Sequence, residues 1–380
     1  MLSRAMSLRV LVVPDKFKGT LTAREAAAAI VEGWRSERAG DVLETLPMSD
    51  GGDGFGDVIG ALLAAEPRAC ATVDAAGQPR NAEWWLDVGE RAAVVEAAQV
   101  NGLALLPRAA YHPFELDSFG LGAVLSEAQL AKAAHVYVGL GGSATNDGGF
   151  GLARSLGWRF FDERDRELRS WTELESLTRV SAPESRLAFE RITVAVDVQN
   201  PLLGANGATR VYGPQKGLAP DELPRAEACL ARLAKIVAPE LAFAPGAGAA
   251  GGLGFGLLAF CQAALEPGVA FFARLSGLEL RIAAADIILT GEGRLDRSSF
   301  MGKGVGAVAA WAARAGKPCW CLAGSVDPAH EADAPPSFRS FSSASGLGAE
   351  RSQATAYERL RALAALAAAR AGAVTAAQLP

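Results

Sequence analysis

The sequence predicts an α/β protein with two domains: a doubly wound parallel sheet, flavodoxin-like or Rossmann-like, and an inserted second α/β domain. Two observations support this prediction. Apolar runs near both chain ends, such as Leu8–Val13 and Ala285–Thr290, are each followed by a polar or glycine-rich loop and a helical pattern, as in the βα units of parallel sheets. In the middle of the chain, the strand-like segments Cys70–Asp74, Ala82–Val88 and Ala92–Glu96 follow one another without helices, which indicates a β-meander.

We therefore expect the chain ends, residues 1–66 and 286–380, to form the doubly wound domain, and residues 67–285 to form the inserted one. A turn at Glu66-Pro67 marks the first boundary. Ligands of open α/β sheets bind beyond the carboxyl ends of the strands, and many binding sites lie between domains. The expected place for an active site is therefore the interdomain cleft.

Composition excludes several classes of protein. The 380 residues carry a formal net charge of −5, which argues against nucleic acid as the main partner. Five cysteines and three histidines lie at no metal-like spacing, so we expect no zinc site, buried thiols and a cytoplasmic location. The uncharged run Leu241–Leu265 is rich in glycine, which favours a buried loop and helix over a membrane span.

The first strand leads into a turn that carries two lysines. Thr22 and Glu25 form a capping-box pattern for the helix that follows. Lys16 and Lys18 therefore stand between a strand end and a helix start, where open α/β sheets bind ligands. Lys18, between an aromatic residue and a glycine, is the better candidate of the two.

The second strand, about Val42–Leu46, leads into an acidic, glycine-rich loop and a helix of about Asp57–Ala65. Asp50 and Asp53 in this loop could bind a metal, accept a proton from a substrate hydroxyl, or cap the helix. We expect capping to account for one of them, and the acids and glycines together to mark a functional loop.

The chain is organised around residues 135–158, which begin with a strand. A loop with little side-chain bulk follows, Gly139 to Ala144, and then a polar cluster and a helical pattern. Backbone N–H groups in such a loop can approach an anion, so this stretch predicts a phosphate cradle at a helix N-terminus. The spacing Gly139-x-Gly141-x-x-Ala144, with Asp162 at the end of the strand-like Trp158–Phe161, also fits a dinucleotide-binding fingerprint. An NAD-binding oxidoreductase, or a turn without function, therefore stays open at this point.

Two later strands end in loops of the same kind. The polar residues of these loops are Asp197, Asn200 and Lys216 after Ile192–Val196, and Glu292, Asp296 and Lys303 after Ala285–Thr290. Acid, amide and ammonium groups thus recur at strand ends beside glycines.

Six stretches of the sequence resemble the bacterial glycerate kinase family, type 1. They are, in order, PDKFKGTLTAREAA, PMSDGGDGF, GLGGSATNDGGFGLARSLG, DVQNPLLGANGATRVYGPQKG, GAGAAGGLG and DIILTGEGRLD with a later GK. The resemblance runs from Pro14 to Lys303. It implies a two-domain α/β enzyme that uses ATP and Mg²⁺ to phosphorylate D-glycerate, generally to 2-phosphoglycerate, in small organic-acid catabolism. The chain departs from the family at Lys16, where Ser is usual, and at Ser298–Lys303, where Gln-Thr-Leu-x-Gly-Lys is usual.

Phosphoryl transfer requires positioning and charge neutralisation more than covalent chemistry. The candidate catalytic residues are Asp197, Lys18, Asp296 and Asp50. Asp197 comes first among them, to orient or deprotonate the attacking hydroxyl or to hold Mg²⁺. The expected substrate-binding or phosphate-binding residues are Gly141, Gly142, Ser143, Thr145, Asn146, Asn200, Lys216, Glu292 and Lys303. Whether the anion at the central loop is a nucleotide phosphate or the glycerate carboxylate stays open.

Three alternatives accompany this hypothesis: glycerate 3-kinase activity, a kinase of the same fold for another small hydroxy acid, and, more distantly, the NAD-binding oxidoreductase. A purely regulatory binding protein would leave the polar loops without a use. We expect a monomer or homodimer whose partners are the small molecules D-glycerate and ATP, without nucleic acid or membrane.

Overall fold

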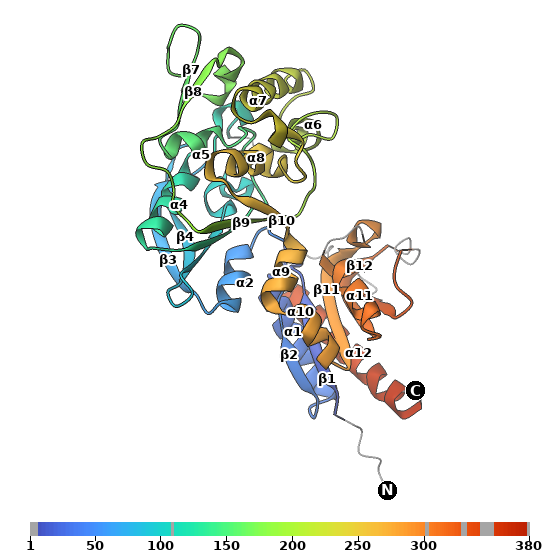
Figure 1. The fold of residues 1–380 in the computed structure, drawn as a ribbon. Helices are drawn as coiled ribbons and strands as arrows, with labels where there is room; N and C mark the ends of the chain where they lie inside the picture. Colours follow the sequence, from blue (N-terminus) through green and yellow to red (C-terminus); the bar gives the residue numbers. More distant parts are fainter. Residues whose placement is uncertain (1–6, 108–109, 301–303, 328–332, 343–352, 378–380) are drawn as a thin grey trace. The chain divides into compact units, whose positions relative to one another are not determined.

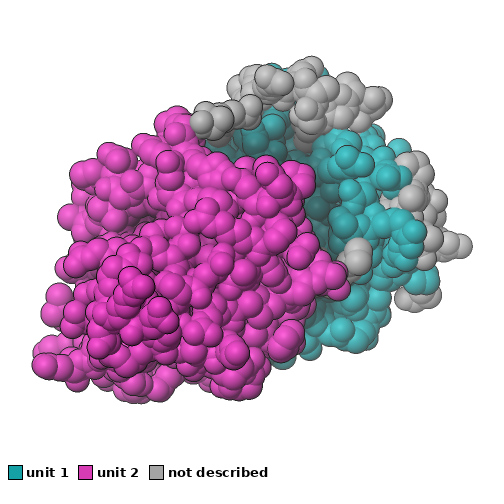
Figure 2. All heavy atoms as spheres, turned by 90° about the horizontal axis from the view of Figure 1, so that it is seen from above, with its two compact units in different colours: residues 1–49, 272–380 teal, residues 50–271 magenta. Residues whose placement is uncertain are grey.

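Contacts between residues divide the chain into two compact units. The structure is a computed structural model and describes residues 7–107, 110–300, 304–327, 333–342 and 353–377. Unit 1 comprises residues 1–49 and 272–380, and unit 2 comprises residues 50–271. Figure 1 shows the elements of each unit, and Figure 2 distinguishes the units by colour.

Unit 1 contains a five-stranded parallel sheet. Its strands are β1 (Arg9–Pro14), β2 (Val42–Thr45), β11 (Ile287–Leu295), β12 (Cys319–Val326) and β13 (Phe338–Ser342). Their order is β13-β12-β11-β1-β2, and every neighbouring pair is parallel. Numbered within the unit, this order is 2-1-3-4-5, that of flavodoxin-like doubly wound sheets. The predicted fold class is confirmed.

Helices bury this sheet. The helices of unit 1 are α1 (Ala23–Glu37), α10 (Leu278–Ala284), α11 (Gly304–Arg314), α12 (Gln353–Ala377) and the 3₁₀ turn η5 (Arg297–Phe300). Helices α1 and α12 share a core with Val10 and Val12 of β1 (Figure 1), while Leu11 and Val13, on the opposite face, are also buried. The predicted capping box is present, since Thr22 Oγ1 accepts from Glu25 N at 3.1 Å and Thr22 N donates to Glu25 Oε2 at 2.8 Å.

Unit 2 contains a six-stranded mixed sheet. Its strands are β3 (Glu66–Val73), β4 (Pro79–Asp87), β5 (Ala92–Glu96), β6 (His135–Gly139), β9 (Arg191–Val196) and β10 (Ala264–Pro267), in the order β10-β9-β6-β5-β4-β3. The predicted meander β3–β5 is antiparallel. Strands β5, β6, β9 and β10 are parallel, so their carboxyl ends share one edge of the sheet.

Helices of unit 2 pack on both faces of this sheet and form a second core. The helices are α2 (Phe55–Leu62), α3 (Ala98–Asn101), α4 (Gly120–Leu130), α5 (Phe150–Ser155), α6 (Ala208–Lys216), α7 (Leu223–Val237) and α8 (Ala249–Cys261), with the 3₁₀ turns η1 (Leu103–Leu105), η2 (Pro113–Glu115), η3 (Trp171–Ser176) and η4 (Pro239–Phe243). Helices α4 and α8 share a core with Trp84 of β4. The neighbouring Trp85 faces the other way and contacts α2. Helices α5 to α8 enclose the second core, with Trp171 of η3 at its centre.

The unit boundaries differ from those expected from the sequence. A Cβ added at Gly56 would lie 1.9 Å from the Trp85 ring, so α2 packs directly on β4 and belongs to unit 2. At the other junction, in α9 (Gly268–Ser276), the Phe271 ring lies 5.8 Å from Phe55 and 5.2 Å from Tyr137, centroid to centroid. These long-range aromatic contacts place the junctions at 49/50 and 271/272, rather than at 66/67 and 285/286.

The glycine-rich stretch Leu241–Leu265 forms η4, a loop, α8 and the start of β10. Ala250, Gly251 and Gly252 have left-handed backbone angles that interrupt α8. Among the described helices, none is long and apolar enough to cross a membrane.

We expect Gly56→Ala to destabilise unit 2 by about 1–3 kcal/mol, because the added methyl group overlaps the Trp85 ring. Replacing glycine by alanine in a helix is otherwise stabilising. The sign of the change in the free energy of unfolding therefore tests the packing of Gly56 against Trp85. Denaturant unfolding, followed by tryptophan fluorescence, measures the effect. The control is Gly89→Ala, whose Cβ would lie 3.4 Å from its nearest neighbour, Asp87 Oδ1. Equal unfolding midpoints for the two variants would contradict this packing of α2.

Candidate functional site

The carboxyl edge of the parallel strands in unit 2 brings together most of the residues predicted from the sequence. The loop Gly141–Asn146 follows β6, and Asp197 and Asn200 follow β9. The loop that contains Asp50 packs against both, and Lys216 ends α6. These segments are distant in the sequence, and the sheet brings them together.

Two glycine loops lie backbone against backbone at this edge. A Cβ at Gly141 would lie 2.2 Å from Gly52 Cα, and a Cβ at Gly142 would lie 2.0 Å from Asp53 Oδ1. A Cβ at Gly51, where φ is +101°, would lie 2.6 Å from the carbonyl oxygen of Ala195. Side chains are therefore excluded at these positions, and the Asp53 carboxylate is held against Gly142.

The loop before α2 is anchored by Glu96 at the end of β5. Its Oε1 accepts from Gly54 N at 3.0 Å and its Oε2 from Gly56 N at 2.9 Å. Burial raises the pKa of Glu96, and these two N–H donors act in the opposite direction. The first amides of α2 are thus satisfied by Glu96, and the cap predicted from Asp50 or Asp53 is wrong. Asp50 Oδ1 accepts instead from Gly52 N at 3.2 Å.

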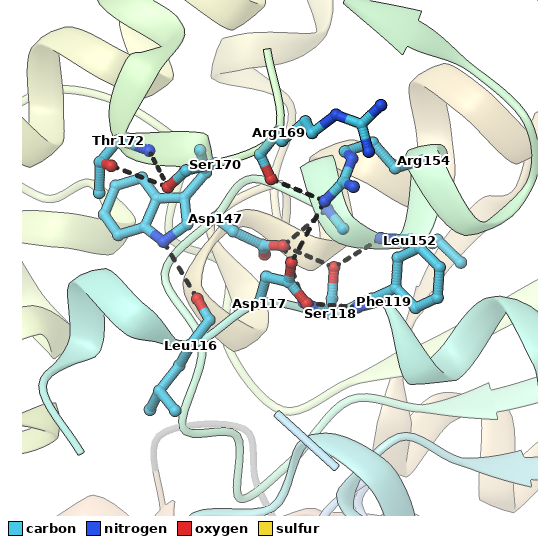
Figure 3. Close-up of polar contacts among 12 residues, drawn as sticks. Leu116, Asp117, Ser118, Phe119, Asp147, Leu152, Arg154, Arg169, Ser170 and Thr172 are labelled. Carbon is cyan, nitrogen blue, oxygen red and sulfur yellow. Dashed lines mark hydrogen bonds and ion pairs between the residues drawn. The ribbon is translucent and has the colours of Figure 1, made fainter. Parts of the chain in front are cut away.

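Asp147 is the centre of a buried cluster behind the loop (Figure 3). Its Oδ2 accepts from Ser118 N at 2.9 Å, Ser118 Oγ at 2.7 Å and Gly151 N at 2.9 Å, and its Oδ1 accepts from Gly149 N at 3.1 Å. Ser118 Oγ in turn accepts from Leu152 N at 3.0 Å. We call these five residues the Asp147 cluster. It holds the start of α5 against the segment before α4.

Asp117 lies beside this cluster. Its Oδ2 is 3.8 Å from Nη1 of Arg154, which also donates to the Arg169 carbonyl at 2.7 Å (Figure 3). Burial raises the pKa of Asp117 to about 6, and the charge of Asp147 acts in the same direction. Asp117 is therefore a structural neighbour of Asp147, and Arg154 only partly offsets the negative charge of Asp117.

The Asp147 cluster changes where an anion could bind. Helix α5 has only six residues, and the amides of Gly149 and Gly151 at its start are already bonded to Asp147. The start of α5 therefore does not contribute donors to the predicted anion site, and anion binding by the glycine loop itself stays a prediction. By contrast, the amides of Gly141, Gly142 and Ser143 donate no hydrogen bond to any described residue. Their N–H groups are the ones that remain for a ligand.

Lys216 brings a buried ammonium group to this loop. Its Nζ donates to Ser143 Oγ at 2.9 Å and to the Thr145 carbonyl oxygen at 2.6 Å. The residue is 9% exposed and forms no ion pair with a carboxylate in the described part of the chain. Burial lowers the pKa of Lys216 to about 7, while the charge of Asp147 acts to raise it. A buried ammonium with neutral partners favours an anionic ligand.

One face of α6 ties the loops together. Thr209 Oγ1 accepts from Asn146 Nδ2 at 3.1 Å, and Tyr212 Oη donates to Asn200 Oδ1 at 2.7 Å. Burial raises the pKa of Tyr212, with a further contribution from Asp197. Thr209, Tyr212 and Lys216 are spaced by three and four residues, which places them on one helical face. Thr209 and Tyr212 were not predicted from the sequence, although their spacing from Lys216 indicates a shared helical face.

Several buried polar atoms near the loop have no hydrogen-bond partner among the described residues. They are Thr145 Oγ1, Asn146 Oδ1 and both side-chain polar atoms of Asn101. The main-chain carbonyl oxygen of Asn101, a residue not predicted from the sequence, accepts from Ala144 N at 2.7 Å. An unpaired buried polar group costs about 1–3 kcal/mol, so these atoms are typical of a site completed by a ligand.

The other predicted residues lie in unit 1. Asp15 N donates to the Gly291 carbonyl at 2.8 Å, so the loop after β1 begins beside β11, at the point where the strand order reverses. Lys18 lies in the loop after β1, and Glu292 lies within the carboxyl-terminal half of β11, near the usual ligand position of a doubly wound sheet. Asp296 accepts from Ser298 N at 2.9 Å and from Ser298 Oγ. The bond from the Ser298 hydroxyl is the main cause that lowers the pKa of Asp296. Lys303 lies outside the described residues.

The structure does not have the strand arrangement that a dinucleotide-binding fingerprint requires. Strand β7 (Arg159–Phe161) pairs with β8 (Arg179–Ser181) in a separate antiparallel sheet, and in the described part of the chain it does not join the sheet of β6. Asp162 closes a turn by accepting from Arg164 N and Arg166 N, both at 2.9 Å. A dinucleotide fold would instead place this strand beside β6 and the acid at its ligand edge.

We expect Asp147→Asn to destabilise the protein by about 2–3 kcal/mol, because one oxygen cannot accept from all four donors and the new NH₂ group faces an N–H. Thermal and denaturant unfolding measure this. The control is Asp165→Asn on the exposed turn, where Asp165 pairs with Arg179, and a change within about 0.5 kcal/mol is expected. An Asp147→Asn protein as stable as this control would show that the cluster is not structural.

Comparison with known proteins identifies the family. The model of the glycerate kinase family matches residues 10–372. A glycerate kinase of Halalkalibacterium halodurans is 37% identical over 85% of this chain and 87% of its own, and the glycerate 2-kinase of Escherichia coli K12 is 35% identical over 84% and 86%. A crystal structure from Salmonella typhimurium LT2, provisionally named glycerate kinase 2, matches with a TM-score of 0.83 at 35% identity, over 97% of this chain and 99% of that one. The chain belongs to the glycerate kinase family.

Proposed function

We propose that this protein transfers the terminal phosphoryl group of ATP to D-glycerate and releases 2-phosphoglycerate. Membership of the family and the name of the Escherichia coli relative support the reaction and its regiochemistry. Within unit 2, one observation carries the proposal. A buried ammonium, unbonded loop amides and carboxylates meet at the ligand edge of a parallel sheet.

This arrangement suits phosphoryl transfer because it positions and neutralises anions. The amides of Gly141 to Ser143 and the Lys216 ammonium are donors fixed in place before a ligand arrives, so little reorganisation is needed when it binds. The four hydrogen bonds of Asp147 and the contact between the two glycine loops keep this segment rigid. No covalent intermediate is required.

Mg²⁺ fits the chemistry of these residues. The described part of the chain holds no group of three or more His, Cys, Asp or Glu side chains arranged to bind a metal. Mg²⁺ at kinase sites usually keeps several waters and binds one or two carboxylates plus the substrate phosphates, so single carboxylates such as Asp197 or Asp53 suffice. When bound, the ion would supply charge neutralisation for the phosphates.

We assign Asp197 to orienting or deprotonating the attacking hydroxyl. It directly follows β9, and its charge acts on Tyr212 of α6, the helix that carries Lys216. Asp50 is the alternative in this unit, and Asp53 joins it because its carboxylate lies against Gly142.

Asp197→Asn should lower kcat by about 10²–10⁴-fold, the usual contribution of a general base, with the KM values for ATP and D-glycerate little changed. Steady-state kinetics on Asp50→Asn and Asp53→Asn, made in parallel, provide the comparison. A near-wild-type kcat for Asp197→Asn together with a large loss in one of the others would transfer the role to that residue.

The product identifies the reaction. Purified protein with ATP, Mg²⁺ and D-glycerate should give the ³¹P NMR signal of 2-phosphoglycerate, judged against authentic 2- and 3-phosphoglycerate. The 3-isomer would keep the enzyme and overturn the regiochemistry. ATP consumption only with another hydroxy acid would change the substrate, and an intact ATP pool with every acid tried would contradict kinase activity.

We further propose a cytoplasmic enzyme that acts as a monomer or homodimer. All five cysteines are free thiols and four of them are buried, a pattern typical of a reducing compartment. Size-exclusion chromatography with light scattering decides between the two oligomeric states.

A further inference from the structure

The Lys216 ammonium has unused capacity for a hydrogen bond. An ammonium group has three N–H donors, and two of them are directed to Ser143 Oγ and the Thr145 carbonyl oxygen. Both acceptors are neutral, so the positive charge is buried without a counter-charge in contact. Gly142 is exposed, whereas Gly141 and Ser143 on either side of it are buried, so the loop is reached from solvent at Gly142.

We propose that Lys216, Ser143 and the amides of the Gly141–Ser143 segment bind the carboxylate of the acceptor acid rather than the phosphates of ATP. This assignment rests on the proposed function and decides a point that the sequence left open. It names the ligand class at this edge of unit 2 as a small 2-hydroxy monocarboxylate.

Charge balance favours a carboxylate over a polyphosphate. The cationic group bonded to the Gly141–Asn146 loop is the single ammonium of Lys216. Two carboxylates lie close by: Asp53 Oδ1 against Gly142, and Asp147 behind the loop. One ammonium balances the charge of one carboxylate, whereas a triphosphate carries several negative charges.

The glycine loops of P-loop and dinucleotide-binding motifs bind phosphate together with a helix N-terminus. That contribution is absent at this loop because Asp147 already accepts from the amides at the start of α5. The structure therefore lacks the second feature that a phosphate-binding loop would use, and it keeps the features that suit a single carboxylate.

The unpaired polar atoms indicate hydroxyl groups beside that carboxylate. Asn146 Oδ1 is a buried acceptor, and Thr145 Oγ1 can donate or accept, while Asn146 Nδ2 is already bonded to Thr209. D-glycerate carries a second hydroxyl on C3, which can donate to Asn146 Oδ1 while the attacking 2-hydroxyl stays directed to Asp197. A simple carboxylic acid without the hydroxyl should bind more weakly.

Isothermal titration calorimetry without ATP tests this assignment. Lys216→Met keeps the length of the side chain and removes its charge. It should weaken D-glycerate binding at least about tenfold, since a hydrogen bond to a charged group is lost, and leave the affinity for ADP within about twofold. The control is Lys235→Met, at an exposed lysine on α7, which should change neither affinity.

Ser143→Ala provides a second, milder variant, which is expected to weaken the binding of D-glycerate and to leave the binding of ADP unchanged. Propionate, which lacks the hydroxyl groups, should bind wild-type protein more weakly than D-glycerate.

Proton exchange gives an independent readout. A carboxylate binds the charged form of Lys216. Without ligand, burial lowers the pKa of Lys216 to about 7, although the charge of Asp147 acts to raise it. At pH 8, D-glycerate binding should therefore take up protons, seen as different heats in buffers of different ionisation enthalpy. The uptake should vanish in Lys216→Met.

The outcomes separate the two proposals. Loss of ADP binding with intact D-glycerate binding in Lys216→Met would overturn the assignment and give the site to the nucleotide. Unchanged binding of both would also overturn it. D-glycerate binding that depends on Lys216, in a protein that forms no phosphoglycerate, would support the carboxylate site and contradict the proposed function.

Discussion

The arrangement at the edge of unit 2 depends on one buried carboxylate, that of Asp147. A carboxylate can be buried only if donors replace its hydration, and Asp147 recruits four of them. Those bonds fix the start of α5 and the segment before α4. As a consequence, the residues just before Asp147 lie within reach of α6, where Lys216 and Thr209 bind them.

The buried ammonium of Lys216 is the functional counterpart of that carboxylate. Asp147 has its hydrogen bonds satisfied by the protein, whereas Lys216 is bonded only to neutral oxygens. A protein tolerates such a group where a ligand supplies the missing charge. The site is therefore organised before the ligand arrives, at a cost in stability that binding offsets.

Local patterns in the sequence predicted most of the strands, the capping box at Thr22 and the doubly wound sheet of unit 1, because each depends on neighbouring residues or on connection rules. The features that were missed depend on contacts between distant residues. Glu96, at the end of β5, accepts hydrogen bonds from the start of α2. The contact between Trp85 of β4 and α2 places that helix in unit 2. Likewise, nothing local indicates that the start of α5 is occupied by Asp147. The glycine loop, Ser143 and Lys216 were identified from sequence, but their contact needs the sheet and α6 to bring them together.

The most direct test of this account is the titration of Lys216 itself, followed by NMR in protein labelled with ¹³Cε-lysine. The resonance is assigned by its absence in Lys216→Met. The account predicts a pKa of about 7 for the free protein, because the ammonium is buried without a counter-charge in contact, and a clear rise when D-glycerate is added. An ordinary value near 10.5 that D-glycerate leaves unchanged would contradict it, since Lys216 would then be neither buried nor a ligand of the substrate.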